Sequence, residues 1–235
     1  MNRIQRLVLV TFLPLTVIEL ILVYIYDTSN LVRCVQFAGT VLLFMVAVFV
    51  KKEYKEQKIL VFGFLFSVIG DFFMILLPVI RKDADSNMLG IVCFLLAYVF
   101  VIWTFNRNIR IKLSDALLAL PFIAAITYYF ATMTQYIKGT LFIAVLLFSI
   151  IITIMAWTSV CTLVRGYFTR RIAIIAAIAA VALFSSDMGV AYALFYPPLK
   201  GSVWLEIFIR ATYVPGWTLL LLVVCDKNIH RKVGE

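Results

Sequence analysis

Five ionisable residues lie inside long apolar stretches of this sequence: Glu19, Asp71, Asp187, Glu206 and Arg210. A charged group in a segment that crosses a bilayer is costly and usually marks a functional site. Glu206 and Arg210 are four residues apart, which favours a local ion pair. Asp71 and Asp187 have no basic residue within one helical turn. They are therefore the strongest candidates for chemistry.

Two carboxyl groups suffice for one class of hydrolysis. One donates a proton as the general acid, and the other, ionised, activates water. Acetals and glycosides are cleaved in this way through an oxocarbenium-like cation. Protonating the alkene carbon of a vinyl ether gives the same cation, and water then converts it into an aldehyde and an alcohol. Asp71 and Asp187 are the predicted catalytic pair, and we expect neither a metal nor a cofactor.

Other catalytic groups are scarce in the chain. His230 is the only histidine, and we expect it to be solvated near the C-terminus, which argues against a Ser–His hydrolase and a His-ligated zinc site. The four cysteines are scattered singly, so no disulfide framework or thiolate metal site is expected. Neither a P-loop nor a dinucleotide-binding glycine motif is present.

The composition is that of a membrane protein. Of 235 residues, 64% are hydrophobic and 14% charged, and the mean hydropathy is +1.06. Such values predict an all-α, polytopic bundle with a single transmembrane domain over residues 1–235. The net charge of +9 is interpreted as Lys and Arg flanking the spans, so no nucleic-acid partner is expected. The predicted spans are 7–26, 31–50, 58–80, 88–106, 114–132, 138–164, 171–196 and 202–226.

The distribution of basic residues predicts an orientation. Fifteen Lys and Arg residues lie beside the segment ends on one side, and five lie on the other. The richer side should be cytoplasmic, with both termini there, in a plasma or inner membrane. All five ionisable residues then fall in the outer half of the bilayer, where they suggest one polar cavity. The five basic residues on the outer side are Arg33, Arg81, Lys82, Lys138 and Lys200.

Small residues lead to both aspartates. Gly63, Ser67 and Asp71 follow a spacing of four, and AAIAAVALFSS precedes Asp187. Such stripes let helices approach closely, so both acids should lie at helix–helix contacts and not in lipid. The segments LFSVIGD and LFSSD also resemble one another. Such similarity is expected if the chain consists of two related halves of four helices each. Aromatic-rich apolar sequence produces such echoes by chance as well.

Four segments, taken in order, resemble the lysoplasmalogenase (YhhN-like) family of eight-helix membrane proteins. They are FGFLFSVIGDFFMILLP, MLGIVCFLLAYVFVIWTF, LFSSDMGVAYAL and TYVPGWTLLLL. The resemblance implies cleavage of the vinyl ether of lysoplasmalogens, which gives a fatty aldehyde and glycerophospho-ethanolamine or -choline. The site positions that it implies are Asp71 and Asp187, with Ser186 beside the latter.

Three polar positions depart from the family pattern. Tyr98 stands where the family often has His, Trp217 where it has Gln or His, and Gln36-Phe37 where it has Lys-Pro. The resemblance therefore implies a divergent member of the family, whose substrate or activity is open. Predicted substrate-binding residues are Ser67, Tyr98, Ser186, Glu206, Arg210 and Tyr213.

Two further functions remain open at this point. The intramembrane carboxylates and the Pro215-Gly216 pair, which resembles the break in a discontinuous helix, suit a proton-coupled transporter of a small amphiphile. The altered polar positions suit a non-catalytic lipid-binding protein. In the hydrolase reading, Arg210 would meet the phosphate of a lyso-phospholipid taken from the bilayer. The sequence leaves the oligomeric state open.

Overall fold

The computed structural model describes residues 1–26, 29–81, 87–107 and 112–230. This part of the chain is all-α and contains no strand, only an isolated bridge between Phe168 and His230. Two short elements, the π-helix η1 (Phe72–Leu76) and α4 (Leu77–Ile80), continue α3, and a 3-10 turn (Pro197–Leu199) precedes α9. The long helices are α1 (Arg3–Tyr26), α2 (Asn30–Phe49), α3 (Lys55–Asp71), α5 (Asn87–Phe105), α6 (Leu113–Met133), α7 (Thr140–Arg165), α8 (Arg170–Phe195) and α9 (Val203–Val224).

Eight helices of the described residues are long and apolar enough to cross a membrane. They match the eight predicted spans, and their ends differ by four residues at most, at the start of α1. A helix satisfies its own main-chain polar groups, as the hydrocarbon core requires. The predicted fold class is confirmed, and the chain is an integral multi-pass membrane protein.

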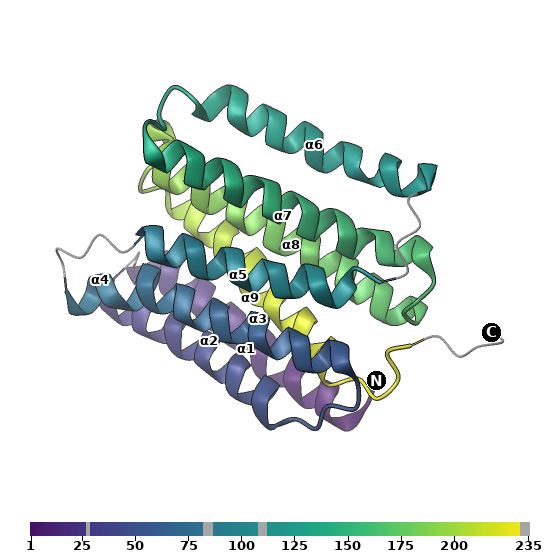
Figure 1. Ribbon diagram of the computed structural model, residues 1–235. Helices are drawn as coiled ribbons and strands as arrows, with labels where there is room; N and C mark the ends of the chain where they lie inside the picture. The colour runs from purple at the N-terminus through teal and green to yellow at the C-terminus, as the bar shows by residue number, and fades with distance from the viewer. Residues whose placement is uncertain (27–28, 82–86, 108–111, 231–235) are drawn as a thin grey trace.

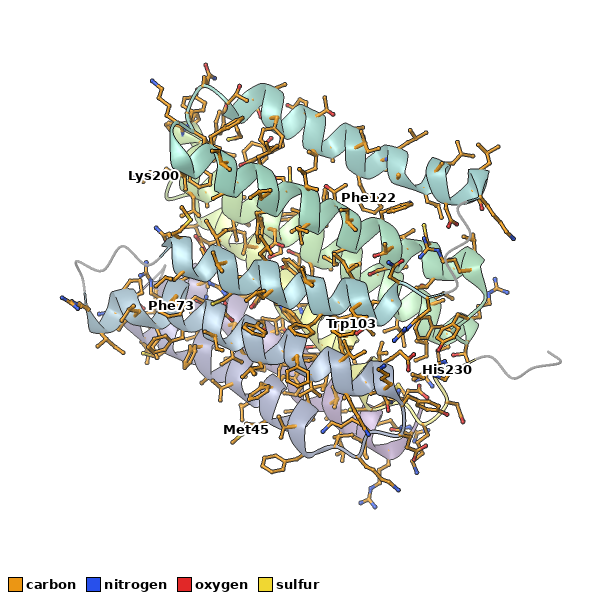
Figure 2. All side chains as sticks on the ribbon, in the orientation of Figure 1. Met45, Phe73, Trp103, Phe122, Lys200 and His230 are labelled. Atoms are coloured by element: carbon orange, nitrogen blue, oxygen red, sulfur yellow. The ribbon has the colours of Figure 1, made fainter. Side chains whose placement is uncertain are left out.

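The helices lie side by side along one direction (Figure 1). The N-terminus and His230 lie at the same end of the bundle, which we call the terminal end (Figures 1 and 2). Phe73 and Lys200 lie at the opposite end, which we call the distal end (Figure 2). In the predicted orientation the terminal end would be cytoplasmic.

Helix α9 is the centre of the bundle, and α6 lies at its edge (Figure 1). Helix α9 packs against α1, α2, α3 and α8, whereas α6 packs mainly against α7. Gly216 permits the close contact with α8, because a Cβ there would stand 2.8 Å from Leu183 and 3.4 Å from the carbonyl oxygen of Ala179. The alanines of α8 and this glycine bring the two helices together, as the small-residue stripe predicts.

Two sequence-based expectations are wrong. Helix α9 continues unbroken through Pro215, so the chain does not have the discontinuous helix that the Pro-Gly pair suggested. His230 is only partly solvated and not free in a polar tail: its side chain is 27% exposed, and its ring lies 4.7 Å from those of Tyr54 and Tyr167. The segment that precedes His230 is held beside α8, because the main-chain N–H of Thr169 donates a 3.0 Å hydrogen bond to the carbonyl oxygen of Ile229.

Candidate active site

Asp71 is held at the junction of three helices. It is the last residue of α3, and it is only 2% exposed. Its Oδ2 accepts a 2.6 Å hydrogen bond from Thr40 of α2 and a 2.8 Å hydrogen bond from the hydroxyl of Tyr213 of α9. Tyr213 was predicted as a site residue, but Thr40 was not. A threonine in an apolar helix ordinarily bonds its own main chain, as Thr40 also does with the carbonyl of Gln36.

The π-helical turn η1 begins immediately after Asp71. Here the N–H of Leu77 bonds to the carbonyl of Phe72, five residues back. Pro78 has no N–H to donate to the preceding turn, which removes one α-helical hydrogen bond at this point. Such wide turns frequently mark functional sites. The sequence FFMIL carries no recognised signal for it.

Asp187 has a different environment. It lies in the second half of α8, is 9% exposed, and its Oδ2 is buried without a hydrogen-bond partner. The side chain of Tyr98, fully buried on α5, interacts with it, although the phenol oxygen of Tyr98 also lacks a partner in hydrogen-bonding geometry. Asp187 interacts electrostatically with Asp71 as well. Both acids thus lie at helix–helix contacts.

The two aspartates line one cavity of about 240 Å³. It lies toward the distal end, because Arg33 belongs to the first turn of α2, Glu206 to the first turn of α9, and Phe195 ends α8. One wall is polar and is made by α2 and α9. Its residues are Arg33, Gln36, Glu206, Arg210 and Tyr213. The rest of the lining, which we call the apolar wall, comes mainly from η1, α5, α7 and α8 and includes Met74, Ile75, Ile91, Phe94, Val145, Phe148, Ile152, Ala191 and Leu194.

The sequence model of the YhhN family matches residues 32–224, which include both aspartates and the cavity residues from Arg33 to Tyr213. The chain belongs to the YhhN family. No curated protein and no solved structure matched it. The resemblance found in the four sequence segments is therefore confirmed at the level of the family.

The three positions that were predicted to depart from the family pattern lie at or beside the cavity. Tyr98 and Trp217 are both fully buried, and their rings stack 6.4 Å apart at an interplanar angle of 10°. Tyr213 and Phe94 pack around them, with ring centroids 6.5 Å from Trp217 and 6.4 Å from Tyr98 respectively. These rings close the cavity toward the terminal end. Gln36, in contrast, is a polar residue that lines the cavity itself.

Glu19 is a buried carboxylate behind the polar wall. It is 0% exposed, neither of its side-chain oxygens has a hydrogen-bond partner, and it interacts electrostatically with Arg210 and Asp71. It fits because α2 has Gly39 at this point, where a Cβ would stand 2.7 Å from Glu19 Oε1. Glu19 does not line the cavity, so its effect on a ligand would pass through Arg210.

The remaining predicted residues divide into two groups. Glu206 and Arg210 line the cavity, but no ion pair joins them. Ser67 and Ser186 do not line the cavity. Their hydroxyls instead donate hydrogen bonds to the main-chain carbonyls of Phe64 and Ile209, at 2.9 and 3.2 Å respectively. Among the described residues, no group of three His, Cys, Asp or Glu is placed to hold a metal ion.

Proposed function

We propose that this YhhN protein hydrolyses the vinyl ether bond of a single-chain lipid of the lysoplasmalogen type. The observation that carries the proposal is that two buried carboxyl groups with unlike hydrogen bonding face one amphipathic cavity. A polar wall and an apolar wall suit a molecule with a headgroup and one alkyl chain. The products are a fatty aldehyde and a glycerophospho-alcohol.

The hydrogen bonding suggests which aspartate is the general base and which is the general acid. Asp71 accepts hydrogen bonds from Thr40 and Tyr213, and an ionised carboxylate is a pure acceptor. We therefore assign Asp71 as the base that orients and deprotonates water. Asp187 Oδ2 has no donor bound to it and is assigned as the acid.

The reaction then balances without any further reactant. Asp187 protonates the alkene carbon that does not bear oxygen, which gives an oxocarbenium cation. Water attacks the cationic carbon and gives its proton to Asp71. The hemiacetal hydroxyl gives its proton to Asp187 as the bond to the glycerol oxygen breaks and the aldehyde forms, and the glycerol oxygen takes the proton held by Asp71 and leaves as the alcohol. Overall, one water molecule is consumed and both carboxyl groups are restored.

The aromatic rings at the closed end of the cavity support this chemistry. Phe94 and Tyr213 line the cavity, and Tyr98 and Trp217 lie behind them. Aromatic faces attract cations through their quadrupoles. Rings at this place would favour the oxocarbenium intermediate over neutral substrate, which is the differential binding that catalysis requires.

The test is aldehyde release by the purified full-length protein in detergent. A vinyl ether lyso-phospholipid is compared with an ester lyso-lipid and a saturated alkyl ether lyso-lipid of the same chain length. Release of aldehyde from the vinyl ether alone is expected. Tight binding of all three lipids without turnover would identify a lipid-binding protein instead. Proton-driven uptake into proteoliposomes without turnover would identify a transporter.

A further inference from the structure

We infer that Arg33, together with Gln36 and Arg210, forms a headgroup site that binds the phosphate of the lipid between about one and two helical turns away from Asp71. The inference rests on the proposed function for its substrate and adds where the headgroup lies. Arg33 was predicted only as a basic residue that flanks a span. In the structure its side chain lines the cavity.

Helix α2 presents three polar residues to the cavity side in order. Arg33, Gln36 and Thr40 are spaced by three and four residues, so they lie on one face of the helix. Thr40 ends this row by donating to Asp71. With a rise of 1.5 Å per residue, the main chain at Arg33 lies about 10 Å from that at Thr40 along the axis.

Helix α9 presents a second row that ends at the same carboxylate. Glu206, Arg210 and Tyr213 follow the same kind of spacing, and Tyr213 donates to Asp71. Both rows therefore run from the distal mouth of the cavity to Asp71, the proposed catalytic base.

The guanidinium groups on this wall are available to a ligand. Arg33 forms no ion pair and no side-chain hydrogen bond with any residue that the structure describes, and the Nε of Arg210 is buried without a partner. Glu19 partly balances the charge of Arg210 from behind. Of the two arginines on the polar wall, Arg33 is therefore the one whose positive charge has no acidic partner among the described residues. Guanidinium groups suit phosphate oxygens in geometry and charge, and Gln36 adds an uncharged donor.

The apolar wall gives the alkyl chain of the lipid a course along α8. Ala191 and Leu194 of α8 lie one and two turns distal to Asp187, so this wall also leads from the acids to the mouth. In the proposed pose, the headgroup follows α2 and α9, the chain follows the apolar residues of α8, and the vinyl ether lies between them beside both aspartates.

The experiment measures equilibrium binding to the full-length protein in detergent, with a saturated alkyl ether lyso-phospholipid that cannot be cleaved. A neutral monoalkylglycerol of the same chain length is the comparison ligand. Arg33→Gln and Arg210→Gln should each weaken binding of the phospholipid about tenfold or more, the size of a charge-assisted contact, and change binding of the neutral lipid less than about twofold. Arg33→Lys should retain part of the affinity.

Arg81→Gln is the matched control, since Arg81 is an exposed arginine at the distal end that does not line the cavity. Phospholipid binding that is unchanged in Arg33→Gln would overturn the inference, as would an equal loss for both ligands. Glycerophosphate without a chain should bind far more weakly. If it binds as well as the lipid, the site is one for free phosphate. If the binding pattern holds but no vinyl ether is cleaved, the headgroup site stands and the proposed reaction fails.

Discussion

The hydroxyl of Tyr213 donates a 2.8 Å hydrogen bond to Oδ2 of Asp71 and so ties α9 to the end of α3. Thr40 of α2 donates to the same oxygen at 2.6 Å. Three helices thus fix one buried carboxylate before any substrate arrives. Such preorganised polar groups lower the cost of placing charge in the transition state.

Removing these donors should impair turnover and leave folding intact. Thr40→Val and Tyr213→Phe are each expected to lower kcat for the vinyl ether about tenfold, the effect of losing one hydrogen bond to a charged group. KM should change little, because neither hydroxyl is assigned to the headgroup. Thr218→Val is the control: Thr218 is equally buried but bonds only to the carbonyl of Val214. Full activity in both Asp71-partner variants would contradict the role of Asp71 as the base.

The proposed proton transfer predicts an isotope pattern. In D₂O, the released aldehyde should carry one deuterium on the carbon next to the carbonyl, because the acid delivers a solvent-derived proton to the alkene carbon. Mass spectrometry of the trapped aldehyde measures this, with unlabelled aldehyde incubated in parallel to correct for exchange. Aldehyde without the added mass would rule out protonation at carbon.

Gly70 and Gly63 offer a matched pair on α3. A Cβ at Gly70 would stand 2.8 Å from the ring of Phe94, which lines the cavity and packs against Tyr98 and Tyr213. Gly70→Ala should therefore cost about 1–3 kcal/mol of stability through overpacking and also reduce activity. A Cβ at Gly63 meets the carbonyl oxygen of Ala97 at 3.4 Å, an ordinary contact.

Gly63→Ala should hence be neutral or slightly stabilising, as alanine favours the helix by about 0.5–1 kcal/mol. Thermal unfolding in detergent and aldehyde release measure the two effects. Equal behaviour of the two variants would show that the close approach of α3 and α5 at Gly70 does not shape the site.

At the terminal end, stability should depend on pH through Tyr167. Burial, and then the hydrogen bond that Tyr167 donates to Glu56 at 3.0 Å, raise the pKa of this phenol above 10.0. A raised pKa in the folded state means that the contribution is complete below the unfolded-state pKa and is lost as pH rises through the folded-state value. Tyr167→Phe should therefore lower the Tm at pH 8, and this difference should shrink as the pH rises through the folded-state pKa of Tyr167.

Tyr128→Phe is the control for this measurement, because Tyr128 is exposed on α6. The hydrogen bond should contribute up to about 1 kcal/mol. If the loss of Tm in Tyr167→Phe grew as the pH rose, the hydrogen bond to Glu56 would not be the source of the stabilisation.

Hydrophobic length made the spans predictable, because a segment that crosses the hydrocarbon core has to be apolar over about 20 residues. Asp71 and Asp187 stood out for the same reason, since an acid in such a segment is expensive. Each of these inferences depends on one segment alone.

The partners of these acids were much harder to predict. Thr40 and Asp71 are 31 residues apart, and nothing local in either helix indicates that they meet. Arg33 appears in the sequence as an ordinary flanking cation, and His230 as part of a polar tail. Their positions follow from how helices and tail pack, which local composition does not encode. The π-helical turn after Asp71 likewise depends on a missing N–H at Pro78 and on the neighbouring helices.

The most direct test of the central claim is aldehyde release by Asp71→Asn and Asp187→Asn, measured beside the wild-type protein on the vinyl ether lyso-phospholipid. Asparagine keeps the shape of the side chain but can neither give up nor accept the catalytic proton, so each variant should lose at least about a hundredfold in rate. Unchanged Tm values and unchanged binding of the uncleavable alkyl ether lipid would show that both variants fold and hold the ligand. Wild-type aldehyde release from either folded variant would contradict the assignment of the two aspartates as acid and base.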